Sequence, residues 1–556
     1  MLVGSSNLRK AGFAGALAAL AVGLVALLYL ASIHAAIGNS DGASEVLKGQ
    51  ALASGNLTLD HWALSLDSFW LVEGPMYAVA VAIAGVRPQL LHLVPAVAAA
   101  LVVALGAGIA REGRKGSAGW LASGTVVVLL GLPAAAFAEV SLFGGDHAVT
   151  TLWCLIALVA LRKLRFGAGF AVAVAFLAAG LLGDLLTVAI GIVPIALAGL
   201  VMVIRARRFR AGSVPMVAAI SSVLVAGAVH ELSKLVGTYT IGPANPRAPI
   251  HQMVANLWHA AVYGSEMMGL GYRSMGTSRI PPALQVAHSV GVLLIAGAVV
   301  VWTGSILRSI FSRRPRFRGG RPRVFWAPGT VQDPGRDGAF WLDSALTFGF
   351  FGSIVEYVVL ASVPSPPVAR YLVPCVVFGA VLAGRSVGRV VGSIDAPWLL
   401  ASVLVVALAV TAGDATSFAG TISEPLPYQP ATKLVSYLER HSLHRGIGDY
   451  WSSSDVTVQS SDEVKVRAVV AIQGTEHLAR YMRQSSSTWF RPGFQFLVYD
   501  TANPWGNVNA KSAAVSFGPP SQAVAVGPYV VLRWAHLLRV SPDGRFEQQP
   551  WMSATY

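Results

Sequence analysis

The sequence is poor in charged residues and in cysteine, and these shortages exclude several classes of protein. Only 12% of its 556 residues are Asp, Glu, Lys or Arg, about half of the fraction that is usual in soluble domains. The two cysteines, Cys154 and Cys375, both lie inside apolar runs, so no disulfide framework is expected. The chain also lacks internal repeats and any tight metal-binding spacing such as His-Glu-x-x-His. A protein that is soluble along its whole length and a disulfide-rich scaffold are therefore excluded.

Long apolar runs replace the missing charge. Hydrophobic residues make up 54% of the sequence, and a run of about 20 apolar residues can cross a bilayer as a helix. The sequence predicts a polytopic α-helical membrane protein with about eleven transmembrane helices. Abundant Ala, Gly, Val and Arg favour a GC-rich bacterium, such as an actinobacterium, as its source. The predicted spans are residues 11–33, 88–110, 117–138, 148–161, 166–183, 185–204, 211–229, 282–307, 344–362, 366–384 and 396–413.

The basic residues indicate the orientation of these spans. The 41 Lys and Arg exceed the 27 Asp and Glu, and they form short clusters between the apolar runs, as cytoplasmic loops do. This pattern favours a membrane protein over one that binds nucleic acid. Residues 71–85 are too short to span the bilayer, and counting them as an interfacial helix places every basic cluster on the cytoplasmic side. We therefore expect a multi-pass protein of the cytoplasmic membrane with its amino terminus inside and its carboxyl terminus outside.

A drop in hydropathy divides the chain into two predicted domains. Residues 1–413 would form a transmembrane domain with outer loops and interfacial helices, and residues 414–556 an extracytoplasmic soluble domain. The second domain is expected to be a small α/β or mainly β domain. The pattern there predicts a helix at 430–440 and strands at 456–458, 464–472, 494–499 and 529–532.

The run GIGDYW at 446–451 of that domain combines an exposed-looking acid with Tyr450 and Trp451. Aromatic rings beside an acid are a common means of gripping a sugar. The alternative is a turn that buries both rings in the core.

Two acidic sites would lie at the outer ends of the predicted spans. Asp41 follows the first span, where a carboxylate is costly unless it has a function or a partner. The alternative is that Ser40 and Asp41 cap a helix. Asp146 and His147 follow a Gly-Gly pair in the second outer loop, and together they suit a divalent metal such as Mg, Mn or Ca. The alternative there is a turn whose Asp caps the next helix.

Arg370 and Tyr371 stand near the outer end of a late span. Arginine can pair a lipid phosphate bidentately, although its side chain can also extend to the lipid headgroups. Glu73, Lys234 and His251 are further candidates for contacting a donor or an acceptor.

Together these residues resemble the GT-C superfamily of membrane glycosyltransferases, which use polyprenyl-phosphate sugars. The resemblance covers residues 10–413 and rests on the order and sidedness of four elements. The elements are Asp41 after the first span, Pro-Met-Tyr at 75–77, Asp146 in the next outer loop and Arg-Tyr-Leu-x-Pro at 370–374. The chain departs from the family at the first of them, because many members carry paired acids where this chain has Ser-Asp-Gly.

The resemblance implies an inverting transfer of a sugar from a polyprenyl-phosphate donor to a hydroxyl of a glycan, lipid or protein acceptor of the cell envelope. Asp41 would be the base that takes the acceptor proton. Arg370 and Tyr371, or a metal beside Asp146 and His147, would bind the donor phosphate. The expected partners are these substrates and the membrane lipids, and no nucleic acid.

Two other functions stay open at this point. A transporter or flippase would use intramembrane acids such as Asp184 and Asp343, although the hydropathy shows no inverted repeat. A non-catalytic scaffold for envelope assembly would have no need of Asp41.

Overall fold

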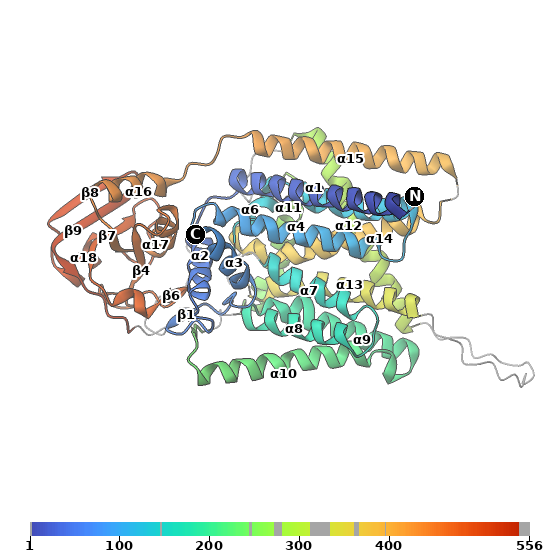
Figure 1. Cartoon of the computed structure of the whole chain (residues 1–556), viewed down its shortest axis with the longest axis horizontal. Coiled ribbons are helices and arrows are strands. Elements are labelled where there is room, and N and C mark those ends of the chain that lie inside the picture. Colours follow the sequence, from blue (N-terminus) through green and yellow to red (C-terminus); the bar gives the residue numbers. More distant parts are fainter. Residues whose placement is uncertain are drawn as a thin grey trace, which may run out of the picture.

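The computed structural model describes residues 3–543 apart from 145–146, 244–246, 272–280, 312–333, 361–365 and 395. The molecule is elongated and consists of two parts that follow one another along its long axis (Figure 1). The larger part is a bundle of long helices. The smaller part contains a β-sheet and lies at one end of the bundle.

The helical part contains most of the chain. Its α-helices, in chain order, are α1 (Val3–Ala35), α2 (Ser40–Ala53), α3 (Glu73–Ala84), α4 (Leu90–Arg111), α5 (Gly116–Gly131), α6 (Ala135–Ser141), α7 (Ala148–Leu161), α8 (Ala168–Gly183), α9 (Val193–Ala206), α10 (Ser213–Leu235), α11 (Ile250–Met267), α12 (Pro282–Phe311), α13 (Pro334–Leu360), α14 (Val373–Val391) and α15 (Pro397–Ser423). Short elements interrupt them, namely β1 (Trp62–Leu64), β2 (Thr240–Ile241), the π-helix η1 (Val188–Ile192) and the 3₁₀-helices η2 (Phe209–Ala211) and η3 (Pro366–Leu372).

The prediction of a polytopic helical membrane protein is confirmed, but the count of eleven spans is not. Among the described residues, eight helices are long and apolar enough to cross a bilayer, or nine if the bent pair α5–α6 forms one span. The predicted spans at 148–161 and 166–183 are the shorter apolar helices α7 and α8. The predicted span at 117–138 is broken, because the chain turns by 79° between α5 and α6, around Pro133, which cannot continue a helix.

Within residues 71–85 the chain forms the short helix α3. Its 12 residues are too few to cross a bilayer. The helix packs against α2 and lies with it between the bundle and the C-terminal part (Figure 1).

The core of the bundle surrounds α14, the most deeply buried of the candidate spans. Its small residues permit close packing, since a Cβ at Gly384 would lie 2.5 Å from the carbonyl oxygen of Ala122 on α5. Such close contact between helices is typical of membrane bundles.

Two of the basic clusters meet at the end of the bundle where α4 stops and α5 starts. Arg114 donates to the carbonyl oxygen of Arg385 at 2.7 Å, and Arg385 donates to the buried carboxylate of Asp343. Arg389 of the same helix lies over the ring of Trp302, 4.0 Å from its centre. The helices α2 and α3 and the C-terminal part lie at the opposite end (Figure 1). Arg114, Arg385 and Arg389 therefore lie together at one end of the bundle, and the side of the membrane that this end faces stays a prediction.

The C-terminal part is built on a six-stranded mixed sheet with the strand order β5-β4-β3-β7-β9-β8. The central strand β3 pairs in parallel with both β4 and β7, and the outer pairs are antiparallel. The strands of the six-stranded sheet are β3 (Arg445–Gly448), β4 (Lys465–Ala471), β5 (Leu478–Arg480), β7 (Phe494–Asp500), β8 (Gln522–Val526) and β9 (Tyr529–Leu538). The C-terminal part also contains β6 (Ser485–Ser486), which belongs to a separate small sheet. Its helices are α16 (Pro430–Arg440), α17 (Tyr450–Gln459), the 3₁₀-helix η4 (Ser487–Phe490) and α18 (Ala510–Phe517).

Four of the five elements that the sequence pattern predicted here are present, and one is wrong. The predicted helix at 430–440 is α16, and the predicted strands at 464–472, 494–499 and 529–532 lie in β4, β7 and β9. The predicted strand at 456–458 is wrong, because these residues belong to α17. Since β3 and β4 are parallel, a crossover must join them, and α17 is that crossover. Val456 and Val458 are both fully buried on it, and they pack into two different hydrophobic clusters.

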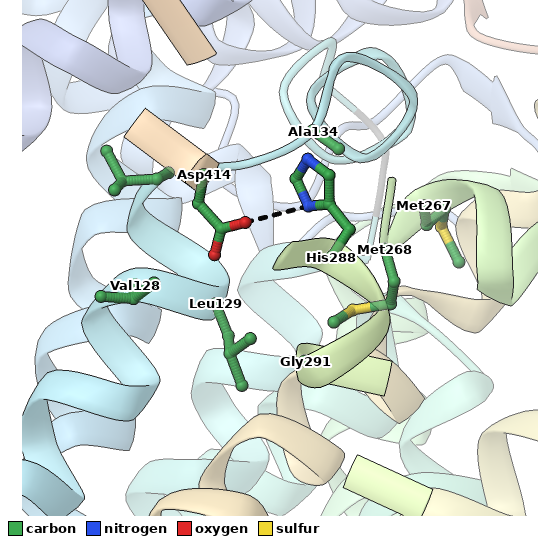
Figure 2. A pocket seen from close by; sticks show the side chains of 9 residues that line it. Val128, Leu129, Ala134, Met267, Met268, His288, Gly291 and Asp414 are labelled. Atoms are coloured by element: carbon green, nitrogen blue, oxygen red, sulfur yellow. Dashed lines mark ion pairs between the residues drawn. The ribbon is translucent and has the colours of Figure 1, made fainter. Parts of the chain in front are cut away.

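The predicted division at residues 413/414 falls inside α15, which continues to Ser423. Asp414 marks a drop in hydropathy in the sequence, but its side chain turns toward α12. There His288 Nδ1 lies 3.1 Å from an oxygen of Asp414, beside Leu129 and Met268 (Figure 2). A partner of this kind allows a carboxylate to lie within a span.

The two parts are joined by paired strands and by helix packing. The first loop supplies β1, which pairs in parallel with β2 and antiparallel with β6 of the C-terminal part. The helix α17 packs against α2, where the hydroxyl of Ser40 donates to the carbonyl oxygen of Trp451 at 3.0 Å. The hydroxyls of Ser44 and Ser454 are hydrogen-bonded to each other at 3.2 Å. The first loop and the C-terminal part therefore form one continuous structure.

Candidate active site

Asp41 lies at this junction, in the first turn of α2. The N-cap of the helix is Asn39, whose side chain accepts a 3.0 Å hydrogen bond from the backbone N–H of Gly42. Asn39 therefore fills the capping role that the sequence also allowed for Ser40 and Asp41. Gly42 lets α2 start against the next loop, since a Cβ there would lie 2.6 Å from the carbonyl oxygen of Phe143. The carboxylate of Asp41 is left for contacts outside its own helix.

Two of the predicted site residues converge on that carboxylate. Arg370 Nη1 of η3 lies 3.4 Å from Asp41 Oδ2, and the hydroxyl of Tyr450, in the first turn of α17, donates to Asp41 Oδ1. The side chains of Asp41 and Arg370 are 32% and 24% exposed, so a ligand can reach both. Three distant stretches of the sequence thus supply a carboxylate, a guanidinium and a phenol to one place.

Tyr450 is held rigidly in this position. Its ring is 4% exposed and packs against Trp451 and Tyr481, with ring centres 4.9 and 5.1 Å away. Burial raises the pKa of Tyr450 well above its usual range, and the charge of Asp41 raises it further. The phenol therefore stays neutral and acts as a hydrogen-bond donor. Tyr450 is therefore buried, as the alternative interpretation expected, but it belongs to α17 and not to a turn, whereas Trp451 is half-buried.

Tyr371 belongs to a second cluster directly beside Arg370. Its hydroxyl donates to Asp67 Oδ2 at 2.8 Å, and its ring centre lies 4.4 Å from that of His147. His147 Nδ1 lies 2.6 Å from Asp184 Oδ2. Burial raises the pKa of Asp67 and the charge of Asp184 raises it further, whereas His147 and Tyr371 lower it. The cluster fixes the orientation of Tyr371 and therefore of the short helix that carries Arg370.

The metal site predicted at Asp146 and His147 is only partly visible. Asp146 lies outside the described residues. His147 uses Nδ1 for Asp184, and within the described part of the chain its buried Nε2 has no hydrogen-bond partner. No group of three or more His, Cys, Asp or Glu that could hold a metal occurs among the described residues. These residues do not form a metal site by themselves, and the metal stays a prediction.

A buried ion pair on the next two turns of α2 helps to fix the position of the helix that carries Asp41. Lys48 Nζ lies 2.7 Å from Glu45 Oε1 and donates to the carbonyl oxygen of Ser68 at 2.5 Å. Both side chains are almost completely buried. Burial raises the pKa of Glu45, while the charge of Lys48 lowers it. Because an unpaired buried charge is costly, this pair fixes α2 against the loop that contains Ser68.

Several predicted residues lie elsewhere. Glu73 is buried in the first turn of α3, Lys234 is exposed on α10 and pairs with Glu231 at 2.7 Å, and His251 is exposed at the start of α11. No described contact brings any of the three to Asp41. The acid of the GIGDYW run, Asp449, is not exposed as its sequence context suggested, because it is fully buried and caps α17.

Sequence reasoning did not assign site roles to Lys48, Asp67 and Trp505, the last of which packs against Tyr450 with the ring centres 5.6 Å apart. For Lys48 a signal was present, since Asp41, Glu45 and Lys48 are spaced i, i+4 and i+7 and must share one face of a helix. Asp67 and Trp505 stand in irregular loops, and nothing in the sequence relates them to Asp41. Their positions follow from tertiary packing alone.

The comparisons with known proteins are sparse. No protein-family model matches the sequence, and no curated protein does. Among solved structures, the chain is similar to crystal structures of ArnT from Cupriavidus metallidurans in the apo state and bound to undecaprenyl phosphate. The identities are 12% and 13% and the TM-scores 0.48 and 0.46, and each match covers 93% of this chain and 98% of ArnT. At this level of similarity the matches say nothing about the role of the site, and that role has to be inferred from the contacts of the site itself.

Proposed function

We propose that this protein is an inverting glycosyltransferase of the GT-C type, which transfers a sugar from a polyprenyl-phosphate donor to a hydroxyl of a cell-envelope acceptor. The observation that carries the proposal is the convergence of Arg370 and Tyr450 on Asp41, at one end of a polytopic helical bundle. A base and a phosphate-binding cation at a bilayer-facing site are the two groups that this transfer needs.

Asp41 acts as the base. A carboxylate within hydrogen-bond reach of the acceptor hydroxyl takes its proton as the oxygen attacks the anomeric carbon. Tyr450 holds Oδ1 of that carboxylate, which leaves Oδ2 to face the acceptor.

Arg370 binds the leaving phosphate. Its guanidinium can grip a phosphate with two parallel hydrogen bonds, and it balances the charge that develops as the bond to the sugar breaks. The 3.4 Å contact between Arg370 and Asp41 is long for a charged hydrogen bond. A donor phosphate therefore displaces it easily, and the displacement frees Asp41 Oδ2 for the acceptor.

The position of the site in the fold supports a lipid-linked donor. Arg370 lies just before α14, a helix apolar enough to span the bilayer, so a phosphate at Arg370 would have its lipid tail alongside the bundle. The site lies at the end opposite to the basic clusters, which under the positive-inside rule is the extracytoplasmic end.

The acids that favoured a transporter have local partners instead. Asp184 is paired with His147 and Asp343 with Arg385. Buried acids that are already paired, and that belong to different clusters, do not outline a path for a transported ion or substrate.

The proposal is tested by Asp41→Asn in the purified full-length chain, with release of polyprenyl phosphate and sugar transfer as the readouts. Removing a general base lowers the rate by about 100-fold or more. Asp60→Asn, an exposed acid of the same loop, is the matched control and keeps wild-type activity. Transfer by folded Asp41→Asn at the wild-type rate would exclude the base role. A chelator series on the wild-type chain tests the metal prediction separately, since loss of activity that Mg, Mn or Ca restores is its expected sign.

A further inference from the structure

Beyond the transfer site lies a cluster of aromatic rings that the proposed mechanism does not use. Trp505 packs against Tyr450 and Tyr481, with ring centres 5.6 and 4.9 Å away, and Trp451 packs against Tyr450 from another side. Tyr450 and Tyr481 are buried, whereas Trp451 and Trp505 are half-buried. The buried rings therefore fix two indoles at the surface of the C-terminal part, and one of those buried rings also binds Asp41.

The loop that carries Trp505 is held in place by its backbone. The N–H of Ala471 in β4 donates to the carbonyl oxygen of Gly506 at 2.9 Å, and the N–H of Val508 donates to that of Trp505 at 3.2 Å. Gly506 has a φ of +64°, and a Cβ there would lie 2.9 Å from the side chain of Val470. Only glycine lets the loop lie this close to the sheet. Trp505 is thus presented in one orientation before any ligand arrives, which limits the entropy lost on binding.

We propose that Trp505 and Trp451, which both pack against Tyr450, form a subsite for a neutral saccharide acceptor that places one of its hydroxyls at Asp41. A flat indole face takes up the apolar C–H face of a sugar ring, and polar groups around it satisfy the hydroxyls. The exposed side chains of Asn503 and Asn507 flank Trp505 in the same loop and can supply such groups. These amides suit a saccharide better than a lipid chain. The proposal rests on the proposed transfer reaction and specifies its acceptor.

The test uses the full-length chain in detergent micelles on an array of neutral gluco-, galacto-, manno- and arabino-oligosaccharides. The wild-type chain is expected to bind at least one series. Trp505→Ala weakens this binding about tenfold, the loss expected for one aromatic contact, while Trp505→Phe, which keeps a ring, restores most of it. Tyr428→Ala removes a 56% exposed aromatic of the same region away from the cluster and leaves binding unchanged.

The subsite is refuted if the wild-type chain binds none of these series, if Trp505→Ala binds as well as wild type, or if only phospholipid or peptide probes bind. Release of polyprenyl phosphate from the donor, measured on the same preparation with water as the acceptor, separates this result from the proposed function. Donor cleavage without saccharide binding refutes the subsite alone. Saccharide binding that depends on Trp505, without donor cleavage, supports the subsite and contradicts the transferase.

Discussion

The hydrogen bond from Tyr450 to Asp41 gives the sharpest prediction, because Tyr450→Phe removes one oxygen atom and little else. The phenyl ring keeps its contacts with Trp451, Tyr481 and Trp505. Because only the hydroxyl oxygen is removed and the buried ring stays in place, the change leaves no large cavity for water to fill. The variant therefore probes the orientation of the carboxylate rather than the packing of the domain.

The magnitude follows from the strength and the exposure of this bond. A hydrogen bond to a charged group contributes about 1.5–3 kcal/mol. Asp41 is 32% exposed, so water replaces part of the lost bond, and a value of about 1.5 kcal/mol at the low end of the range is the reasonable one. If the bond orients the base in the transition state, kcat falls about tenfold. The KM for the donor stays near its wild-type value, because the phosphate is bound by Arg370 and not by Tyr450.

The assay measures kcat and the donor KM of the full-length chain in micelles, with thermal unfolding as a check on folding. Tyr437→Phe is the matched control, since Tyr437 lies on α16 with its ring against His441, away from the site. Turnover by folded Tyr450→Phe at the wild-type rate would show that this hydrogen bond does not orient the base. The same conclusion would follow if Tyr437→Phe lost as much activity, or if the whole effect appeared in the donor KM.

Three further predictions concern the surroundings of the site. Arg370→Lys replaces a planar fork with a single ammonium, and the donor KM should rise about tenfold in steady-state assays while the unfolding temperature stays unchanged. Lys48→Met leaves the buried Glu45 carboxylate without its cation and should lower stability by about 3–5 kcal/mol, and a second change, Glu45→Gln, should recover most of this loss in unfolding measurements. Burial raises the pKa of Asp455 from 3.8 to about 7. Between those pH values the folded state therefore binds more protons than the unfolded state. The free energy of unfolding falls as the pH rises through that window. Asp455→Asn should remove this pH dependence, worth at most about 4 kcal/mol, in unfolding curves recorded at low and at neutral pH.

The large-scale features of the fold were predictable because they depend on composition along the chain. Apolar length identifies helices such as α4 and α12 whatever their neighbours are, and charge clusters predict which ends of the helices lie together. The break between α5 and α6 and the true end of α15 were not predictable in this way. The first depends on where Pro133 can be accommodated, and the second on His288, which lets Asp414 lie inside a helix.

The candidate site was predictable in its residue types but only partly in its geometry. Asp41 and Arg370 were singled out because charged residues at the outer ends of spans are costly, and Tyr450 because it stands beside an acid and a second aromatic residue in the GIGDYW run. That Tyr450 binds Asp41 directly could not be read from the sequence, since the two are 409 positions apart. Val456 and Val458 show the same limit, because a short alternating run fits a strand until the parallel pairing of β3 and β4 requires a helix there.

The distance in sequence between these partners explains why the two parts of the protein are so closely joined. Tyr450 can bind Asp41 only if α17 lies directly on α2, and the serines of that contact are small enough to allow it. Ser40 donates to the carbonyl oxygen of Trp451, and Ser44 is linked to Ser454 one turn further along. Larger side chains at these positions would separate the helices and remove the phenol from the carboxylate. The C-terminal part is therefore a component of the site, and its packing on the first loop determines the geometry in which Asp41 meets an acceptor.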